Sequence, residues 1–141
     1  MKAKYLLDTN VLSELVKPRP HSGVIHKIKQ LENSLATSSI VWHELLFGYH
    51  RLIDSKKKKF LKEFLFNVVL PTLPILNYNE QAAEWHARER ALLEAKGKKP
   101  SFADGQIAAI SVANDLILVT NNIKDFESFS DLNLENWHAQ S

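Results

Sequence analysis

The sequence predicts an α/β domain in which a parallel β-sheet is covered by helices. Two observations lead to this fold class: short apolar runs alternate with longer segments, and the longer segments repeat apolar residues at helical spacing. The 141 residues are enough for one ordinary domain with a continuous core, and no repeat, low-complexity tract or break in composition divides them. We therefore expect a single domain spanning residues 1–141.

A buried strand is expected at the start of the chain, because residues 3–7 (AKYLL) form a short, mainly apolar run. A short helix should follow over residues 9–16, since Pro18 and Pro20 would stop it. The other elements expected in this half are a helix at 21–31, a brief strand at 34–37, and helices at 41–53 and 57–69.

Capping residues and a proline mark the elements of the second half. Asn79 and Ser101 are favourable N-cap residues, and Gly97 stands where a helix commonly ends in the left-handed conformation. Pro74 donates no hydrogen bond to a sheet, so residues 73–76 fit only an edge strand. The remaining expected elements are helices from 79 to 96 and from 102 to 114, and strands at 116–120 and 132–137.

The composition excludes several classes of protein. The chain has no cysteine, so it has neither disulfides nor thiolate metal sites, which is compatible with a reducing compartment. No apolar run is long enough for a signal peptide or a membrane span, and we expect a cytoplasmic protein. The net charge of +2 does not by itself indicate nucleic acid. The basic blocks at 56–59 and 96–99 are interpreted as solvated helix surfaces or ends.

Four acidic residues occupy informative places in this arrangement. Asp8 directly follows the first strand, and Asp125 lies in a loop after the strand at 116–120. Ligands bind outside the carboxyl ends of strands in open parallel sheets. Glu44 lies on the helix at 41–53 and Asp104 in the first turn of the helix at 102–114, so both can open onto the same edge of the sheet.

Clustered carboxylates repel one another and RNA phosphates unless cations lie between them. Mg²⁺ and Mn²⁺ prefer carboxylate oxygens and waters, and such ions can activate a water for phosphodiester cleavage. Asn10, Thr120 and Asn122 offer neutral groups that can orient waters or the carboxylates. The four acids are therefore candidate catalytic and metal-binding residues.

Each acid also has a purely structural interpretation. Asp8 can cap the helix that begins at residue 9, and Asp104 stands three residues after Ser101, as in a capping box. Glu44 can be an exposed helix residue and Asp125 a turn residue. Taken one at a time, the residues leave both interpretations open.

Four segments, taken together and in order, resemble one protein family. They are YLLDTNVLSEL at 5–15, SSIVWHELLFG at 38–48, FADGQIAAIS at 102–111 and LVTNNIKDF at 118–126. The sequence resembles the PIN-domain nucleases, specifically the VapC-type toxins of bacterial and archaeal toxin–antitoxin pairs, over essentially its whole length.

This resemblance implies a three-layer α/β/α fold with a five-stranded parallel sheet. It also implies cleavage of RNA with Mg²⁺ or Mn²⁺, and inhibition by a cognate antitoxin protein. Asp8, Glu44, Asp104 and Asp125 match the metal-binding acids of the family, and Asn10 and Thr120 match polar positions beside them. We therefore expect a metal-dependent endoribonuclease, the toxin of a type II toxin–antitoxin system.

A homodimer is also expected. The helices at 41–53 and 57–69 carry more apolar and aromatic side chains than a chain of this size should bury alone, and related toxins are typically dimers. The alternative is that these stripes pack entirely into the core. Trp42, Trp85 and Trp137 are interpreted as core or interface anchors rather than base-stacking platforms. His86 is expected to be a surface or partly buried helix residue rather than a catalyst.

Three other functions remain as alternatives. A haloacid-dehalogenase-like phosphatase needs a second carboxylate two residues after its nucleophile, and here that position is Asn10. A response-regulator receiver needs an acidic pair after the first strand, and only Asp8 is present. A non-catalytic PIN-like module would bind RNA or a protein without cutting, and the presence of all four acids argues against it.

Overall fold

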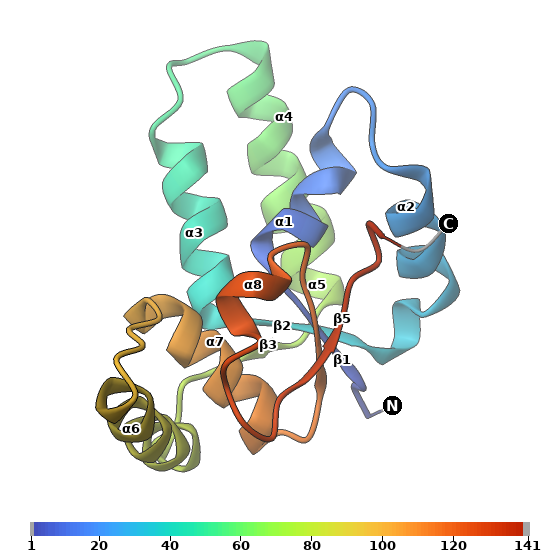
Figure 1. The fold of residues 1–141 in the computed structure, drawn as a ribbon. Coiled ribbons are helices and arrows are strands. Elements are labelled where there is room, and N and C mark those ends of the chain that lie inside the picture. Colours follow the sequence, from blue (N-terminus) through green and yellow to red (C-terminus); the bar gives the residue numbers. More distant parts are fainter. Residues whose placement is uncertain (1, 140–141) are drawn as a thin grey trace.

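A five-stranded parallel sheet forms the centre of the protein, with strand order β3-β2-β1-β4-β5 (Figure 1). The computed structural model describes residues 2–139. The strands are β1 (Tyr5–Leu7), β2 (Leu35–Ser38), β3 (Ile75–Leu76), β4 (Ile117–Val119) and β5 (Asn133–Glu135). All four neighbouring pairs are parallel. Helices flank this sheet, so the expected α/β/α arrangement is confirmed, with β3 at an edge as Pro74 predicted.

The helices largely follow the expected boundaries. They are α1 (Thr9–Leu12), the 3-10 helix η1 (Ser13–Val16), α2 (Ser22–Gln30), the 3-10 helix η2 (Glu32–Ser34), α3 (Ser39–His50), α4 (Lys56–Phe64), the π-helical η3 (Leu65–Val69), α5 (Leu70–Thr72), α6 (Glu80–Ala95), α7 (Phe102–Ala113) and α8 (Ile123–Phe126). None of the helices within residues 2–139 has the length and apolar character needed to cross a bilayer.

Two local features differ from the expectation. The helix predicted at 57–69 widens into a π-helix over its last turn, directly before Pro71. Proline has no N–H to donate to the preceding turn and crowds it, which favours such a distortion. Asp125 does not lie in a loop as predicted. The chain after β4 forms the one-turn helix α8, and this acid is in its first turn.

The predicted capping residues act as expected. The Asn79 side chain accepts a hydrogen bond from the Ala82 N–H at 2.9 Å, and Ser101 Oγ accepts one from the Asp104 N–H at 3.1 Å. Gly97 has a φ of 76° just after α6. This conformation favours glycine and lets the chain turn sharply toward α7.

Helices α6 and α7 approach closely at one glycine. A Cβ atom built on Gly105 would lie 2.2 Å from Nε2 of His86, so only glycine leaves room for that ring. His86 is buried, which corrects the expectation of a surface or partly buried position, and its Nδ1 lies 2.9 Å from the Tyr78 hydroxyl. Burial, followed by the charge of Arg90, lowers the pKa of His86. The imidazole therefore joins the two helices as a neutral group.

Two of the three tryptophans belong to the core, as expected. Trp137 is fully buried and packs edge-on against Tyr5, while Trp85 is buried against Phe129. Trp42 is only partly buried and contacts Phe66 on the neighbouring helix, 5.8 Å between ring centres.

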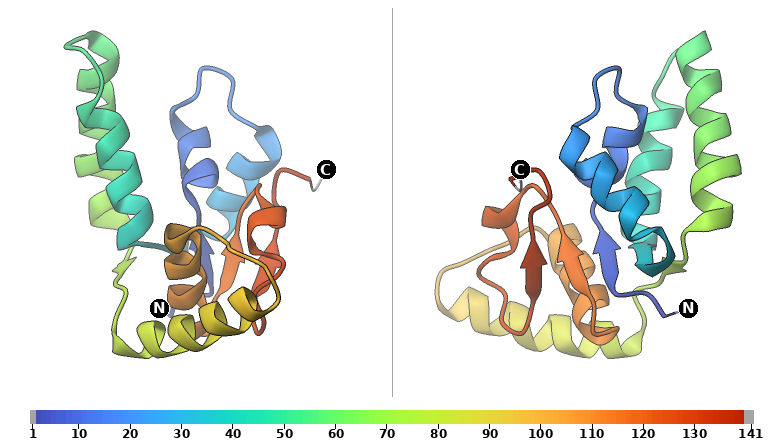
Figure 2. Two further views of the ribbon diagram at one scale, coloured as in Figure 1. Left: turned by 60° about the vertical axis from the view of Figure 1, so that its left-hand side comes forward. Right: turned by 90° about the vertical axis from the view of Figure 1, so that its right-hand side faces the viewer.

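Helices α3 and α4 form an arm that projects beyond the sheet (Figure 2). The large apolar side chains exposed on the arm and on the continuation of α4 are Phe47, Ile53, Phe60, Phe66, Val68 and Leu70. The apolar stripes of these helices therefore do not pack entirely into the core.

Candidate active site

The candidate site begins where the two central strands end side by side. Leu7 of β1 is paired with Val119 of β4, so the next residues, Asp8 and Thr120, leave the same edge of the sheet together. The Asp8 N–H donates to the Val119 carbonyl at 3.0 Å, which continues the ladder by one hydrogen bond. The parallel register thus joins two positions that lie 112 residues apart in the sequence.

Asp8 is nearly buried and accepts hydrogen bonds from neutral groups only. Its Oδ1 accepts from the Thr9 N–H at 2.8 Å, which makes Asp8 the N-cap of α1. Its Oδ2 accepts from the Thr120 hydroxyl at 2.8 Å and from the Asn10 amide at 3.3 Å. The capping interpretation is therefore correct, and it accounts for only one of the two carboxylate oxygens.

Asn10 and Thr120 hold the Asp8 carboxylate through a small network. The Asn10 amide also contacts Thr120 Oγ1 at 3.3 Å, and its carbonyl accepts from the Asn121 N–H at 2.9 Å. Thr120 Oγ1 accepts a further bond from the Asn122 backbone N–H at 3.0 Å. Asn122 thus contacts the site through its backbone N–H.

Glu44 is connected to the site through Thr9. Thr9 Oγ1 donates to Glu44 Oε2 at 3.0 Å, and Glu44 is solvent-exposed on α3. The charge of Glu44 is also one of the causes that raise the pKa of Asp8. Sequence reasoning missed Thr9, although its position directly after Asp8 in the DTN motif could have indicated it.

Asp104 lies at the first turn of α7, where its N–H is held by Ser101. Burial is the main cause that raises the pKa of this carboxyl, the Ser101 hydroxyl opposes the shift, and the charges of Asp125 and then Asp8 raise it further. The carboxylates of α7, α8 and the end of β1 are therefore close enough to repel one another. Asp125 is itself exposed.

Burial is the largest cause of the raised pKa of both Asp8 and Asp104. For Asp8 the hydrogen bonds from Thr120, Thr9 and Asn10 offset it only in part. No cause that raises or lowers the pKa of Asp8 or Asp104 comes from a lysine or arginine. Both carboxylates thus lack a protein cation that would favour their charged form.

The four acids gather at this edge without forming a closed set of ligands. Within residues 2–139, no three histidine, aspartate or glutamate side chains come together closely enough to hold an ion between them. The donor chemistry nevertheless fits a hard divalent cation, because every candidate ligand is oxygen. Mg²⁺ in particular usually binds one or two carboxylates and keeps several waters.

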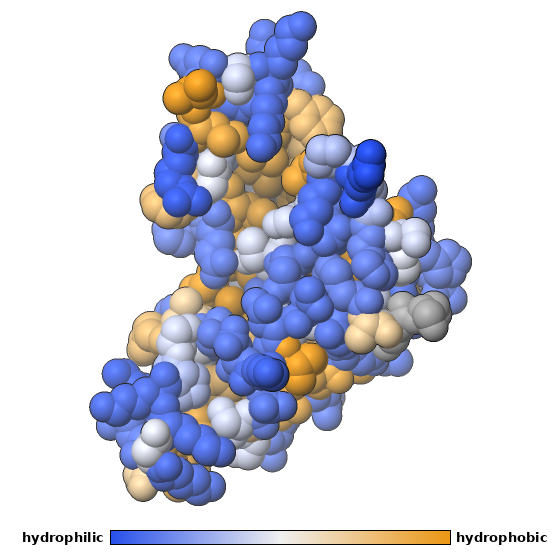
Figure 3. All heavy atoms as spheres, turned by 45° about the horizontal axis from the view of Figure 1, so that its top comes forward, coloured by the Kyte–Doolittle hydropathy of each residue, from blue (hydrophilic) through white to orange (hydrophobic). Residues whose placement is uncertain are grey.

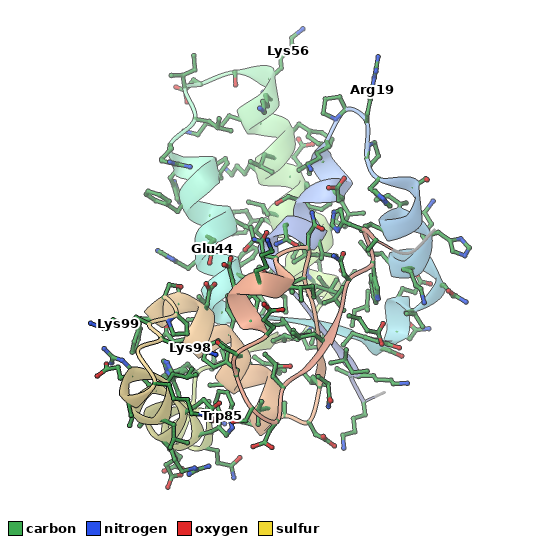
Figure 4. The ribbon with its side chains drawn as sticks, in the orientation of Figure 1. Arg19, Glu44, Lys56, Trp85, Lys98 and Lys99 are labelled. Carbon is green, nitrogen blue, oxygen red and sulfur yellow. The ribbon has the colours of Figure 1, made fainter. Side chains whose placement is uncertain are left out.

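A surface pocket of about 610 Å³ lies beside Asp104 and Asp125. Its lining residues are Lys98, Lys99, Pro100, Ser101, Asp104, Lys124, Asp125, Glu127 and Ser128. Figure 4 places Lys98 and Lys99 below Glu44, on the side of the site nearest α6 and α7. The acidic edge therefore continues into a pocket with basic residues.

A protein with this fold and this group of acids can be assigned to a family by comparison with known families. The family model of the PIN domain matches residues 5–132. The chain belongs to the PIN domain family. A haloacid-dehalogenase-like phosphatase and a response-regulator receiver are thereby excluded as interpretations, and Asn10 has its own contacts beside the acid of this PIN domain.

Similar proteins cover this PIN domain almost from end to end. It is 33% identical to "Ribonuclease VapC2" of Rickettsia felis, over 94% of this chain and 97% of that protein. It is also 33% identical to "Toxin FitB" of Neisseria gonorrhoeae, over 94% and 98% of the two chains. The structure of VapBC2 from Rickettsia felis bound to a promoter DNA fragment superposes with a TM-score of 0.81 at 32% identity, covering 97% of this chain and 99% of that one.

Proposed function

We propose that this PIN domain is a divalent-metal-dependent endoribonuclease and the toxin of a type II toxin–antitoxin pair. The observation that carries the proposal is the group of carboxylates from separate elements at the carboxyl edge of β1 and β4. Glu44 is joined to the residue beside Asp8 through the Thr9 hydroxyl, and Asp104 and Asp125 line one pocket. Its similarity to a protein named as a ribonuclease and to one named as a toxin supports the same function.

Asp8, Glu44, Asp104 and Asp125 would hold Mg²⁺ or Mn²⁺. When bound, such an ion supplies an activated water and stabilises charge on the phosphodiester. Because the carboxylates come from different elements, their charges converge only in the folded chain. Like-charge repulsion among them would then be relieved by the cation, and a doubly charged ion would relieve it more than a singly charged one.

The neutral residues around Asp8 would set the geometry of the ligand. Thr120 donates to one oxygen of Asp8 and is itself fixed by Asn10 and by the Asn122 backbone. The Thr9 hydroxyl donates to Glu44 and so orients the carboxylate of another element. Such groups around a metal ligand hold its oxygen in one direction without neutralising its charge.

A cognate antitoxin would be the protein partner, and a second copy of this chain would complete a homodimer in the cytoplasm. The exposed apolar side chains of the α3–α4 arm support a protein-binding role, because large aromatic side chains such as Phe47 and Phe60 are more than half exposed on it. Light scattering at micromolar concentration should give the mass of a dimer, and a monomeric mass would contradict this part of the proposal.

The enzymatic proposal is tested by RNA cleavage with and without a chelator. We expect the purified protein to cut single-stranded RNA in Mg²⁺ or Mn²⁺, to lose cleavage in excess EDTA and to regain it on adding back either ion. Asp8→Asn serves as the control for contaminating nuclease, because it should remain inactive under all three conditions. Undiminished cleavage in EDTA would contradict a metal-dependent mechanism.

A further inference from the structure

Three lysines share a pocket with the candidate catalytic acids. Lys98 and Lys99 lie in the link between α6 and α7, and Lys124 lies on α8 next to Asp125. All three line the same pocket as Asp104 and Asp125, and all three are exposed. We call Lys98, Lys99 and Lys124 the lysine strip.

The lysine strip does not serve to neutralise the neighbouring acids. None of its members forms an ion pair within the part of the chain that the structure describes, although Asp104, Asp125 and Glu127 line the same pocket. The strip therefore directs its positive charge toward solvent rather than toward protein carboxylates.

The backbone holds the first two lysines in place. Gly97 turns the chain with its positive φ, its N–H donates to the Glu94 carbonyl at 2.9 Å, and the Lys98 N–H donates to the Leu93 carbonyl at 2.8 Å. Pro100 then restricts the conformation of the residue before it. Two adjacent positive charges are thus presented from a fixed turn beside α7.

We propose that the lysine strip binds the phosphates of the RNA strand next to the scissile bond and holds that strand over the acidic edge. This inference rests on the proposed ribonuclease function and identifies where its substrate lies. The acids alone would repel a polyanion, whereas lysines on one side of them attract it. The pocket volume of about 610 Å³ is sufficient for a nucleotide unit.

In the space-filling view, hydrophilic residues cover the middle of the molecule between the arm and the end that carries α6 (Figure 3). A second basic group, which includes Lys56 and Lys59, lines a separate pocket between α3 and α4, and Lys56 lies at the far tip of the arm from Lys98 and Lys99 (Figure 4). The arm lysines therefore provide a matched comparison with the same change in charge.

The test compares Lys98→Ala/Lys99→Ala with Lys56→Ala/Lys57→Ala and with the wild type. All four side chains are exposed, so thermal melts should agree and confirm that the fold is kept. Binding of a fluorescent single-stranded RNA is measured by anisotropy in EDTA over a series of salt concentrations. Lys98→Ala/Lys99→Ala should bind the RNA more weakly than the wild type, because two phosphate contacts are lost. The slope of log affinity against log salt concentration should be smaller by about 1.4 for this variant, at about 0.7 per contact.

Cleavage kinetics provide the second measurement. The Lys98→Ala/Lys99→Ala variant should show a raised KM with a kcat close to that of the wild type, because the acids are untouched. Lys124→Ala should reduce the salt slope by about half as much. The arm variant should keep the wild-type slope and KM.

The outcomes separate this inference from the proposed function. Suppose that the wild type cuts RNA and that Lys98→Ala/Lys99→Ala binds RNA with unchanged affinity and salt slope. The proposed role of the lysine strip would then be overturned, while the proposed ribonuclease function would remain supported. An equal loss of RNA affinity and of salt slope in Lys56→Ala/Lys57→Ala would also overturn it. If the wild type binds RNA through the strip but never cuts it, the ribonuclease proposal fails and the phosphate contact remains.

Discussion

Two nearly buried carboxylates, Asp8 and Glu14, lie six residues apart and have opposite electrostatic surroundings. Glu14 Oε2 accepts from Lys17 Nζ at 2.7 Å and lies 3.0 Å from His138 Nε2, while its Oε1 accepts from the His21 N–H at 2.9 Å. The bond from Lys17, followed by those from His21 and His138, lowers the pKa of Glu14 to about 2 despite its burial.

Asp8 is buried to a similar degree but has only neutral partners, and burial raises its pKa. The difference separates a structural acid from a candidate catalytic one. At Glu14 the protein supplies the cation, and the ion network ties η1 to the C-terminal segment at His138. At Asp8 the protein supplies hydroxyl and amide groups that orient the carboxylate but do not neutralise its charge, which is the arrangement expected of a metal ligand.

The largest effect should come from neutralising the acid that lacks a cation. Asp8→Asn should reduce RNA cleavage by more than about 100-fold, because loss of a metal ligand should exceed the 10- to 100-fold loss typical of the groups that support one. Cleavage rates at saturating Mg²⁺ are the measurement. Asp54→Asn removes an exposed acid of the arm and should leave the rate unchanged. If Asp8→Asn stayed active, Asp8 would not be a catalytic acid, and its difference from the structural acid Glu14 would have no functional meaning.

Loss of one orienting hydroxyl should have the next largest effect. Thr120→Val removes the donor to Asp8 Oδ2, and we expect cleavage or Mg²⁺ affinity to fall by about 10- to 100-fold. The matched control is Thr37→Val, because Thr37 is also buried and its hydroxyl donates to the Leu7 carbonyl at 2.8 Å. Both variants should lose stability, and only Thr120→Val should lose metal affinity. Equal metal affinities for the two would contradict the orienting role.

Glu14→Gln should affect stability rather than chemistry. Removing the carboxylate leaves Lys17, His138 and the His21 N–H with a weaker acceptor, and we expect a loss of about 1–3 kcal/mol in the free energy of unfolding. Urea denaturation at neutral pH gives this value, and cleavage per folded molecule should stay at the wild-type level. A large loss of cleavage in fully folded Glu14→Gln would show that this acid also serves the site.

The Asp104→Asn variant should distinguish a helix-capping role from a metal-binding role by a small change in melting temperature. Burial, followed by repulsion from Asp125 and Asp8, raises the pKa of Asp104, so its charge costs stability at neutral pH and asparagine relieves that cost. In metal-free buffer the variant should melt no lower than the wild type, although asparagine loses about 0.3–1 kcal/mol of favourable interaction with the α7 dipole. Added Mg²⁺ should raise the melting temperature of the wild type more than that of the variant.

This outcome would be reversed if Asp104 only capped its helix. The variant would then melt lower, show no difference in its response to Mg²⁺ and retain cleavage. Thermal melts with and without Mg²⁺, run beside a cleavage assay, distinguish the two roles.

The smallest effect is the pH dependence of the Glu14 network. The folded pKa of about 2 lies below the ordinary value of 4.5, so the charged carboxylate stabilises the fold fully above about pH 4.5. This contribution is lost as the pH falls from 4.5 toward 2. The difference in unfolding free energy between wild type and Glu14→Gln should therefore shrink over that interval. A difference that stays constant would contradict the lowered pKa.

Much of the fold was predictable because its signals are local. Helix ends at Asn79, Gly97 and Ser101 depend on groups within a few residues, and apolar periodicity sets the faces of the helices. The prediction for Asp125 was wrong because a single turn such as α8 is too short to carry a periodic pattern. His86 was also misjudged, since its burial depends on the distant Gly105.

The sequence by itself determined the order of strands and helices, the positions of the four acids along them and the resemblance to the PIN family. Only the tertiary structure placed Thr120 against Asp8 and set the lysine strip beside Asp104 and Asp125. The physical reason is that hydrogen bonds and charge effects act over a few ångströms, whereas the residues concerned are separated by long stretches of chain. Parallel pairing of β1 with β4 brings Asp8 and Thr120 together, and the partners that each buried acid meets there distinguish Asp8, with neutral donors, from Glu14, with Lys17.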